Sequence, residues 1–107
     1  MEPKKSLELL KAGKAILIDV REEEELLMSG MAEGSLWMPT SKITEGHPDW
    51  AAFKSTLPKD KTIILYCRSG NRSGRVAEFL SQEGFNTENM GAFSDWVEQK
   101  LPVQKLR

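Results

Sequence analysis

The segment Cys67-Arg68-Ser69-Gly70-Asn71-Arg72-Ser73-Gly74 has the residue types of an anion-binding loop around a reactive thiol. It follows an apolar run that ends at Tyr66 and precedes a helical pattern that begins near Arg72. If the loop curls around the sulfur of Cys67, the N–H groups of 68–73 point inward, with the positive end of the helix behind them. Such surroundings lower the pKa of a cysteine from about 8.5 to roughly 3.5–7.5. The sequence therefore predicts that Cys67 is substantially ionised at neutral pH.

The other residues of this loop fit the same interpretation. Gly70 and Asn71 are the residue types that a tight reversal of the backbone needs. Arg68 and Arg72 add two fixed positive charges, so we expect the loop to bind an anionic ligand. We assign substrate binding to the whole loop after the cysteine, that is, to Arg68, Ser69, Gly70, Asn71, Arg72 and Ser73.

A simpler alternative exists, because a lone cysteine at the end of a buried strand is usually a small core residue. Two arginines are poor neighbours for a buried apolar thiol, which favours the functional interpretation. The chain offers no base to activate the thiol, because the only histidine, His47, lies in the predicted loop Gly46–Pro48. We therefore expect attack by a thiolate on a sulfur atom, a reaction in which no proton has to move.

The single cysteine also limits what else the chain can contain. It allows no internal disulfide, and one cysteine with one histidine cannot supply the usual zinc sites. We predict neither a metal site nor a cofactor. The net charge of −1 and the lack of exposed aromatics among Arg68, Arg72 and Arg75 speak against nucleic-acid binding. The apolar stretches are too short for a bilayer and no signal peptide is visible, so we expect a cytoplasmic protein without membrane contact.

Alternating apolar segments and helical patterns indicate the elements that position this loop. Strands are expected at 15–20, 36–38, 62–66 and 87–90. Helices are expected at 6–12 with Ser6 as the capping residue, at 22–28, at 48–54, at 75–83 and at 94–101. We expect inward positions for the side chains of Trp50, Phe53, Val76, Phe79, Leu80, Trp96 and Val97.

Strands that are apolar throughout and alternate with helices indicate an α/β domain with a mainly parallel sheet and helices on both faces. In such sheets the site usually lies beyond the carboxyl ends of the strands, where Cys67 falls. No internal repeat or linker interrupts the pattern, so we expect one domain over residues 1–107.

The sequence resembles the single-domain rhodaneses, a family of thiosulfate sulfurtransferase-like proteins. The resemblance rests on Asp19-Val20-Arg21 with Glu24 and Glu25, on the segment 30–39, on the loop 63–73, and on Gly91 with Trp96. It implies a rhodanese-like fold with a five-stranded mainly parallel sheet, and a persulfide carried on Cys67. It also implies that Arg68 holds the anionic donor, that the loop amides stabilise the persulfide, and that Asp19 and Arg21 are structural residues near the site.

Two segments depart from the family pattern. The stretch from Gly30 to Trp37 lacks the usual histidine and asparagine. We expect Trp37 to line the entrance as a substrate-binding residue, and a purely structural tryptophan is the alternative. Gly91-Ala92 stands where a double glycine is usual, which we interpret as a modest change of the backbone.

We expect a sulfurtransferase that moves a sulfane sulfur from thiosulfate, or a similar anionic donor, to a thiol or cyanide acceptor. The alternative is a relay module that accepts a persulfide from a partner protein, since both functions need the same loop. A cysteine phosphatase is disfavoured, because the spacing in those enzymes would place the arginine at position 73, where this chain has Ser73.

Overall fold

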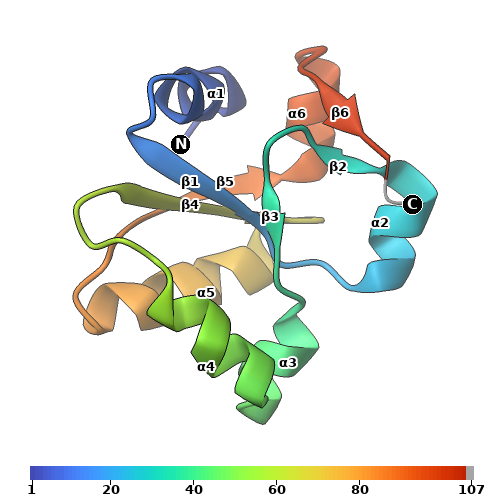
Figure 1. Ribbon diagram of the computed structural model, residues 1–107. Coiled ribbons are helices and arrows are strands. Elements are labelled where there is room, and N and C mark those ends of the chain that lie inside the picture. The colour runs from blue at the N-terminus through green and yellow to red at the C-terminus, as the bar shows by residue number, and fades with distance from the viewer. Residues whose placement is uncertain (106–107) are drawn as a thin grey trace.

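Four parallel strands form the central sheet of the computed structural model, which describes residues 1–105 (Figure 1). They are β1 (Ala15–Asp19), β3 (Leu36–Trp37), β4 (Thr62–Cys67) and β5 (Asn86–Ala92), in the order β3-β1-β4-β5. The central strands β1 and β4 are almost wholly buried, as their continuous apolar sequences predict. The predicted α/β class and the four predicted strand segments are confirmed.

Helices cover both faces of this sheet (Figure 1). On one face lie α3 (Thr40–Glu45), α4 (Pro48–Ser55) and α5 (Asn71–Gln82), and on the other lie α1 (Pro3–Lys11) and α6 (Phe93–Glu98). Because neighbouring side chains of a strand point to opposite faces, Ile18 and Leu65 pack beneath α4 and α5, whereas Leu17 and Ile64 join the second core with Trp96. The remaining helix, α2 (Glu23–Ser29), follows the carboxyl end of β1.

The expectation of five strands in the main sheet is wrong, because that sheet has four. The short strand β2 (Met31–Ala32) pairs antiparallel with β6 (Val103–Gln104) and forms a separate two-stranded ribbon. The four apolar segments predicted from the sequence form the whole main sheet. The fifth strand, which was expected only from the family resemblance, is not part of this sheet.

Several local expectations also need correction. The first helix begins at Pro3, and Ser6 lies inside it, where its hydroxyl donates to the Glu2 carbonyl. Phe79 and Val97 are 42% and 48% exposed, so they do not point into the core as their spacing predicts. The remaining expected inward side chains are buried or packed against the core. Within residues 1–105, no helix is long and apolar enough to cross a bilayer.

Candidate active site

Cys67 is the last residue of β4, at the carboxyl end of the sheet and directly before the loop that leads into α5. Its Sγ accepts a hydrogen bond from the Gly70 amide at 3.0 Å, and the Ser73 hydroxyl lies 3.4 Å away. The residue is buried and packs against the apolar core beneath α5. The cysteine thus combines a core position with polar contacts that a purely structural residue does not need.

The contacts around the sulfur favour its anionic form. Burial alone raises the pKa of the Cys67 thiol, but the Ser73 hydroxyl and the amides of Ser73, Gly70 and Ser69 outweigh burial and bring this pKa below its ordinary value. The N-terminus of α5, a helix of 12 residues, lies behind these amides and adds positive potential. Both effects come from the backbone curl that the sequence predicts.

Gly70 makes the curl possible. It adopts a left-handed conformation with φ of 97° as the residue before α5, a conformation that costs other residues energy. A Cβ atom at this position would also lie 3.2 Å from the Cα of Gly91 on β5. Two features therefore favour glycine at position 70: the left-handed backbone conformation and the close approach of the neighbouring strand.

Asn89 on β5 holds the loop from the side, a role that the sequence analysis missed. Its Nδ2 donates to the Gly70 carbonyl at 3.0 Å, and its Oδ1 accepts from the Ser73 hydroxyl at 2.7 Å and from the Gly91 amide at 3.0 Å. Because the Ser73 hydroxyl has one proton, it cannot donate a hydrogen bond to Asn89 and to a Cys67 thiolate at the same time. The register that sets Asn89 beside Leu65 of β4 is the signal that could have pointed to it.

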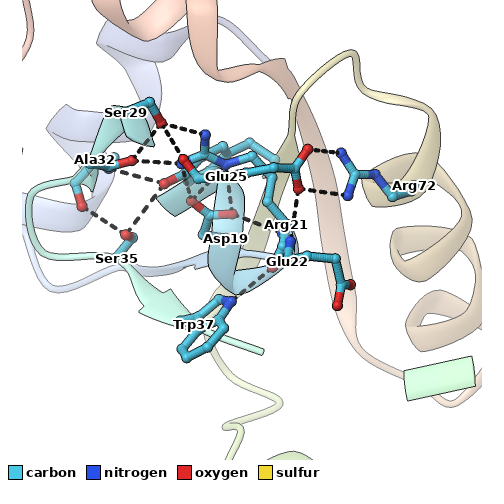
Figure 2. A network of polar contacts seen from close by, with 11 residues as sticks. Asp19, Arg21, Glu22, Glu25, Ser29, Ala32, Ser35, Trp37 and Arg72 are labelled. Carbon is cyan, nitrogen blue, oxygen red and sulfur yellow. Dashed lines mark hydrogen bonds and ion pairs between the residues drawn. The ribbon is translucent and has the colours of Figure 1, made fainter. Parts of the chain in front are cut away.

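Asp19 and Arg21 form a buried ion pair where β1 ends (Figure 2). The guanidinium donates to both carboxylate oxygens at distances of 2.7 to 3.1 Å, and also to the hydroxyl of Ser29 and the carbonyl of Gly30. Its central carbon lies 4.2 Å from the centre of the Phe93 ring on α6. The pair therefore joins β1, the end of α2 and the start of α6.

The two loop arginines differ in their partners. Arg72, expected to bind the substrate, makes a two-pronged ion pair with Glu25 of α2 at 2.8 and 2.9 Å (Figure 2). Arg68 is exposed and has no ion pair or hydrogen bond among residues 1–105. Ser69 and Asn71 are also exposed on the loop. Arg68 is therefore the loop cation that is available to an anion.

A hollow of about 770 Å³ opens beside the loop, between α2 and α6. Its lining includes Arg68, Glu25 and Met28 on one side and Phe93 and Val97 on the other. Trp37 does not line it. That side chain is half-buried, and its indole N–H donates to the Arg21 carbonyl at 2.8 Å (Figure 2). Among the described residues no group of three or more cysteine, histidine or acidic side chains is arranged to hold a metal ion.

Comparisons with known proteins identify relatives of this chain. The model of the rhodanese-like domain matches residues 2–99. The chain is 37% identical over 87 residues to a putative sulfurtransferase of Bacillus subtilis, covering 80% of this chain and 77% of that protein. It is 26% identical over 104 residues to a thiosulfate sulfurtransferase of Actinobacillus succinogenes, covering 95% and 86% of the two chains.

A solved structure of a related protein has a similar fold. The rhodanese-related protein of Thermoplasma volcanium is similar with a TM-score of 0.78 and 31% identity, over 97% of this chain and 95% of that one. Taken together, the matches support sulfur transfer as the general chemistry of this chain. The chain belongs to the family of rhodanese-like domains.

Proposed function

We propose that Cys67 carries a sulfane sulfur as a persulfide between an anionic donor and a thiol or cyanide acceptor. With thiosulfate, the Cys67 thiolate attacks the outer sulfur, the S–S bond of the donor breaks, and sulfite leaves with the electron pair. The product is a Cys67 persulfide anion. In the second step the carbon of cyanide, or the sulfur of a thiol, takes the outer sulfur and the Cys67 thiolate is restored.

One observation carries this proposal: Sγ of Cys67 accepts a hydrogen bond from the Gly70 amide at the N-terminus of α5. The same amides that hold a thiolate can hold the outer sulfur of a persulfide, which also carries a negative charge. Both the attacking group and the leaving group are stable anions, so the absence of a base near Cys67 among the described residues is no obstacle. The sole histidine, His47, caps α4 instead, where its Nδ1 accepts from the Asp49 amide.

Steady-state kinetics of thiocyanate formation test the proposal. Two displacements through a covalent intermediate predict parallel lines in double-reciprocal plots when thiosulfate and cyanide are varied together. We expect Cys67→Ser to abolish turnover, and Arg68→Ala mainly to raise the KM for the donor. Arg75→Ala is the matched control, because it removes one positive charge from an exposed position outside the loop. Its kcat and its KM for the donor should stay within twofold of the native values. Normal turnover by Cys67→Ser would refute the proposal.

A sulfur relay between proteins is the second candidate, and the surface beside the loop favours it. Met28, which lines the hollow, is 90% exposed, and Leu27 and Val97 are also large exposed apolar side chains. Such side chains often mark contacts with another protein. Efficient transfer from a persulfide on a protein donor, together with a KM for thiosulfate far above the millimolar range, would favour the relay.

A further inference from the structure

The charges that surround the loop are mostly already balanced. Of the three arginines near the site, Arg21 is bound to buried Asp19 and Arg72 is bound to Glu25. Of these three, only Arg68 has no carboxylate partner within the described residues, so it is the one left to meet the charge of a substrate. Thiosulfate brings two negative charges to a thiolate that already carries one. The site therefore offers a dianion one free guanidinium and the partial charge of a helix end.

Glu25 is held in place by its own helix and not only by Arg72. Its carboxylate accepts the Glu22 amide at 2.8 Å, in a reciprocal capping arrangement at the start of α2 (Figure 2). The hydrogen bond from Arg72 holds the pKa of Glu25 below its ordinary value, so this carboxylate stays charged near neutral pH. Arg72 thus faces a fixed negative charge that an incoming anion has to displace or share.

The hollow beside the loop is also much larger than a small inorganic anion. Its volume of about 770 Å³ lies within the range of roughly 300–1,000 Å³ that is usual for organic ligands. Phe93, Val97 and Met28 supply apolar walls, Arg68 supplies a cation, and Glu98 adds a second carboxylate to the lining. Cys67 does not line the hollow, which meets the loop at Arg68. The apolar walls therefore fit the body of a substrate whose single charge, at its reacting end, lies at the loop.

We propose that Glu25 withdraws Arg72 from substrate binding, and that the site selects persulfides of organic thiols, with one negative charge at the sulfur, over dianionic donors such as thiosulfate. The inference rests on the proposed function and names its substrate class. The Cys67 thiolate attacks the outer sulfur of the persulfide, the S–S bond breaks, and the organic thiolate leaves with the electron pair. The two reacting groups then carry two negative charges in total, one fewer than with thiosulfate.

Binding of sulfate, an unreactive dianion, tests the role of Glu25 without any turnover. We expect isothermal titration calorimetry to show that Glu25→Gln tightens the Kd for sulfate about fivefold, because Arg72 becomes available. Glutamine still suits the capping arrangement, so α2 is kept. Glu24→Gln is the matched control, because Glu24 is exposed and its substitution removes the same charge one residue away from Glu25. The control should change the Kd by less than twofold.

A double variant shows whether Arg72 causes the effect. In Glu25→Gln with Arg72→Ala, the gain in sulfate affinity should disappear. An unchanged or weaker Kd in Glu25→Gln would overturn the inference, because Glu25 would then orient Arg72 for the substrate instead of withdrawing it. Absence of sulfate binding in both the native chain and Glu25→Gln would overturn it as well.

Donor kinetics complete the test. We expect kcat/KM of the native chain to be at least tenfold higher with 2-hydroxyethyl persulfide than with thiosulfate, and Glu25→Gln to narrow this ratio several-fold. A native preference for thiosulfate would contradict the inference and leave the proposed function intact. If Cys67 takes up sulfur from neither donor, the proposed function fails, whereas the calorimetry still decides whether Glu25 keeps dianions from the loop.

Discussion

At the scale of single residues, the reactivity of Cys67 depends on which acceptor receives the proton of Ser73. The hydroxyl lies 2.7 Å from Oδ1 of Asn89 and 3.4 Å from Sγ of Cys67. In the neutral form the thiol can donate to the Ser73 oxygen, and on ionisation the hydroxyl can turn towards the sulfur. Ser73 therefore stabilises the thiolate selectively.

This arrangement predicts the pH dependence of alkylation. The pKa of Cys67 is lowered, so its reaction with iodoacetamide should reach the plateau at a lower pH than that of a free cysteine. Ser73→Ala removes a hydrogen bond to the anionic form, so the midpoint should move to higher pH. Ser81→Ala, an exposed change on the same helix, is the control and should leave the profile unchanged. A profile for Ser73→Ala that matches the native one would contradict this role.

The sequence alone predicted the loop residues but not the residues that act on them. Gly70 and Arg68 could be assigned because they are local to Cys67 and have distinctive chemistry. Asn89 and Glu25 are 22 and 42 positions away from Cys67, and only strand register and helix placement bring them to the loop. Substrate binding by Arg72 remains a prediction, and the ion pair with Glu25 competes with that role.

At the scale of elements, the turn from β4 into α5 holds the site, and Gly70 is its critical residue. Gly70→Ala forces an alanine into a left-handed conformation and also presses its Cβ against Gly91. We expect it to lower the free energy of unfolding by about 2–3 kcal/mol in urea titrations, and to slow alkylation of Cys67.

Gly13→Ala separates the two causes of that loss. Gly13 also has a positive φ, of 72°, but a Cβ there meets no atom within 4 Å. Its substitution should cost about 1 kcal/mol and leave alkylation unchanged. Equal losses at the two positions would mean that the contact between Gly70 and Gly91 contributes nothing.

The elements also show where periodicity is a good guide. The β-branched, continuously apolar segments of β1 and β4 correctly predicted central strands, because burial on both faces leaves no polar position. Helix α3 was not predicted, since its sequence Thr40–Glu45 is short and has no fully buried residue. Phe79 and Val97 had the right spacing for the core, but both side chains are exposed, so spacing alone did not identify the buried positions.

At the scale of the whole molecule, the ion pair of Asp19 and Arg21 ties together the parts that surround the site. The two side chains are 0% and 4% exposed, so the removal of one leaves an unpaired charge in the interior. We expect Arg21→Ala to reduce the free energy of unfolding by about 3–5 kcal/mol, a large part of the total for a small domain.

Two controls make that prediction specific. Arg75→Ala removes the same charge from an exposed position of α5 and should change stability by about 0.5 kcal/mol or less. Replacement of both partners, as Asp19→Leu with Arg21→Leu, should recover part of the loss, because no buried charge is then unpaired. If the double variant is less stable than Arg21→Ala, the isolated charge is not the cause of the destabilisation.

The central claim is that Cys67 carries the transferred sulfur, and intact-protein mass spectrometry tests it most directly. The native chain and Cys67→Ser are incubated with thiosulfate or with 2-hydroxyethyl persulfide, desalted and weighed before and after addition of cyanide. The account predicts that the native chain gains the mass of one sulfur atom, that cyanide removes it, and that Cys67→Ser gains none. An identical mass increase in Cys67→Ser, or none in the native chain with either donor, would contradict the account.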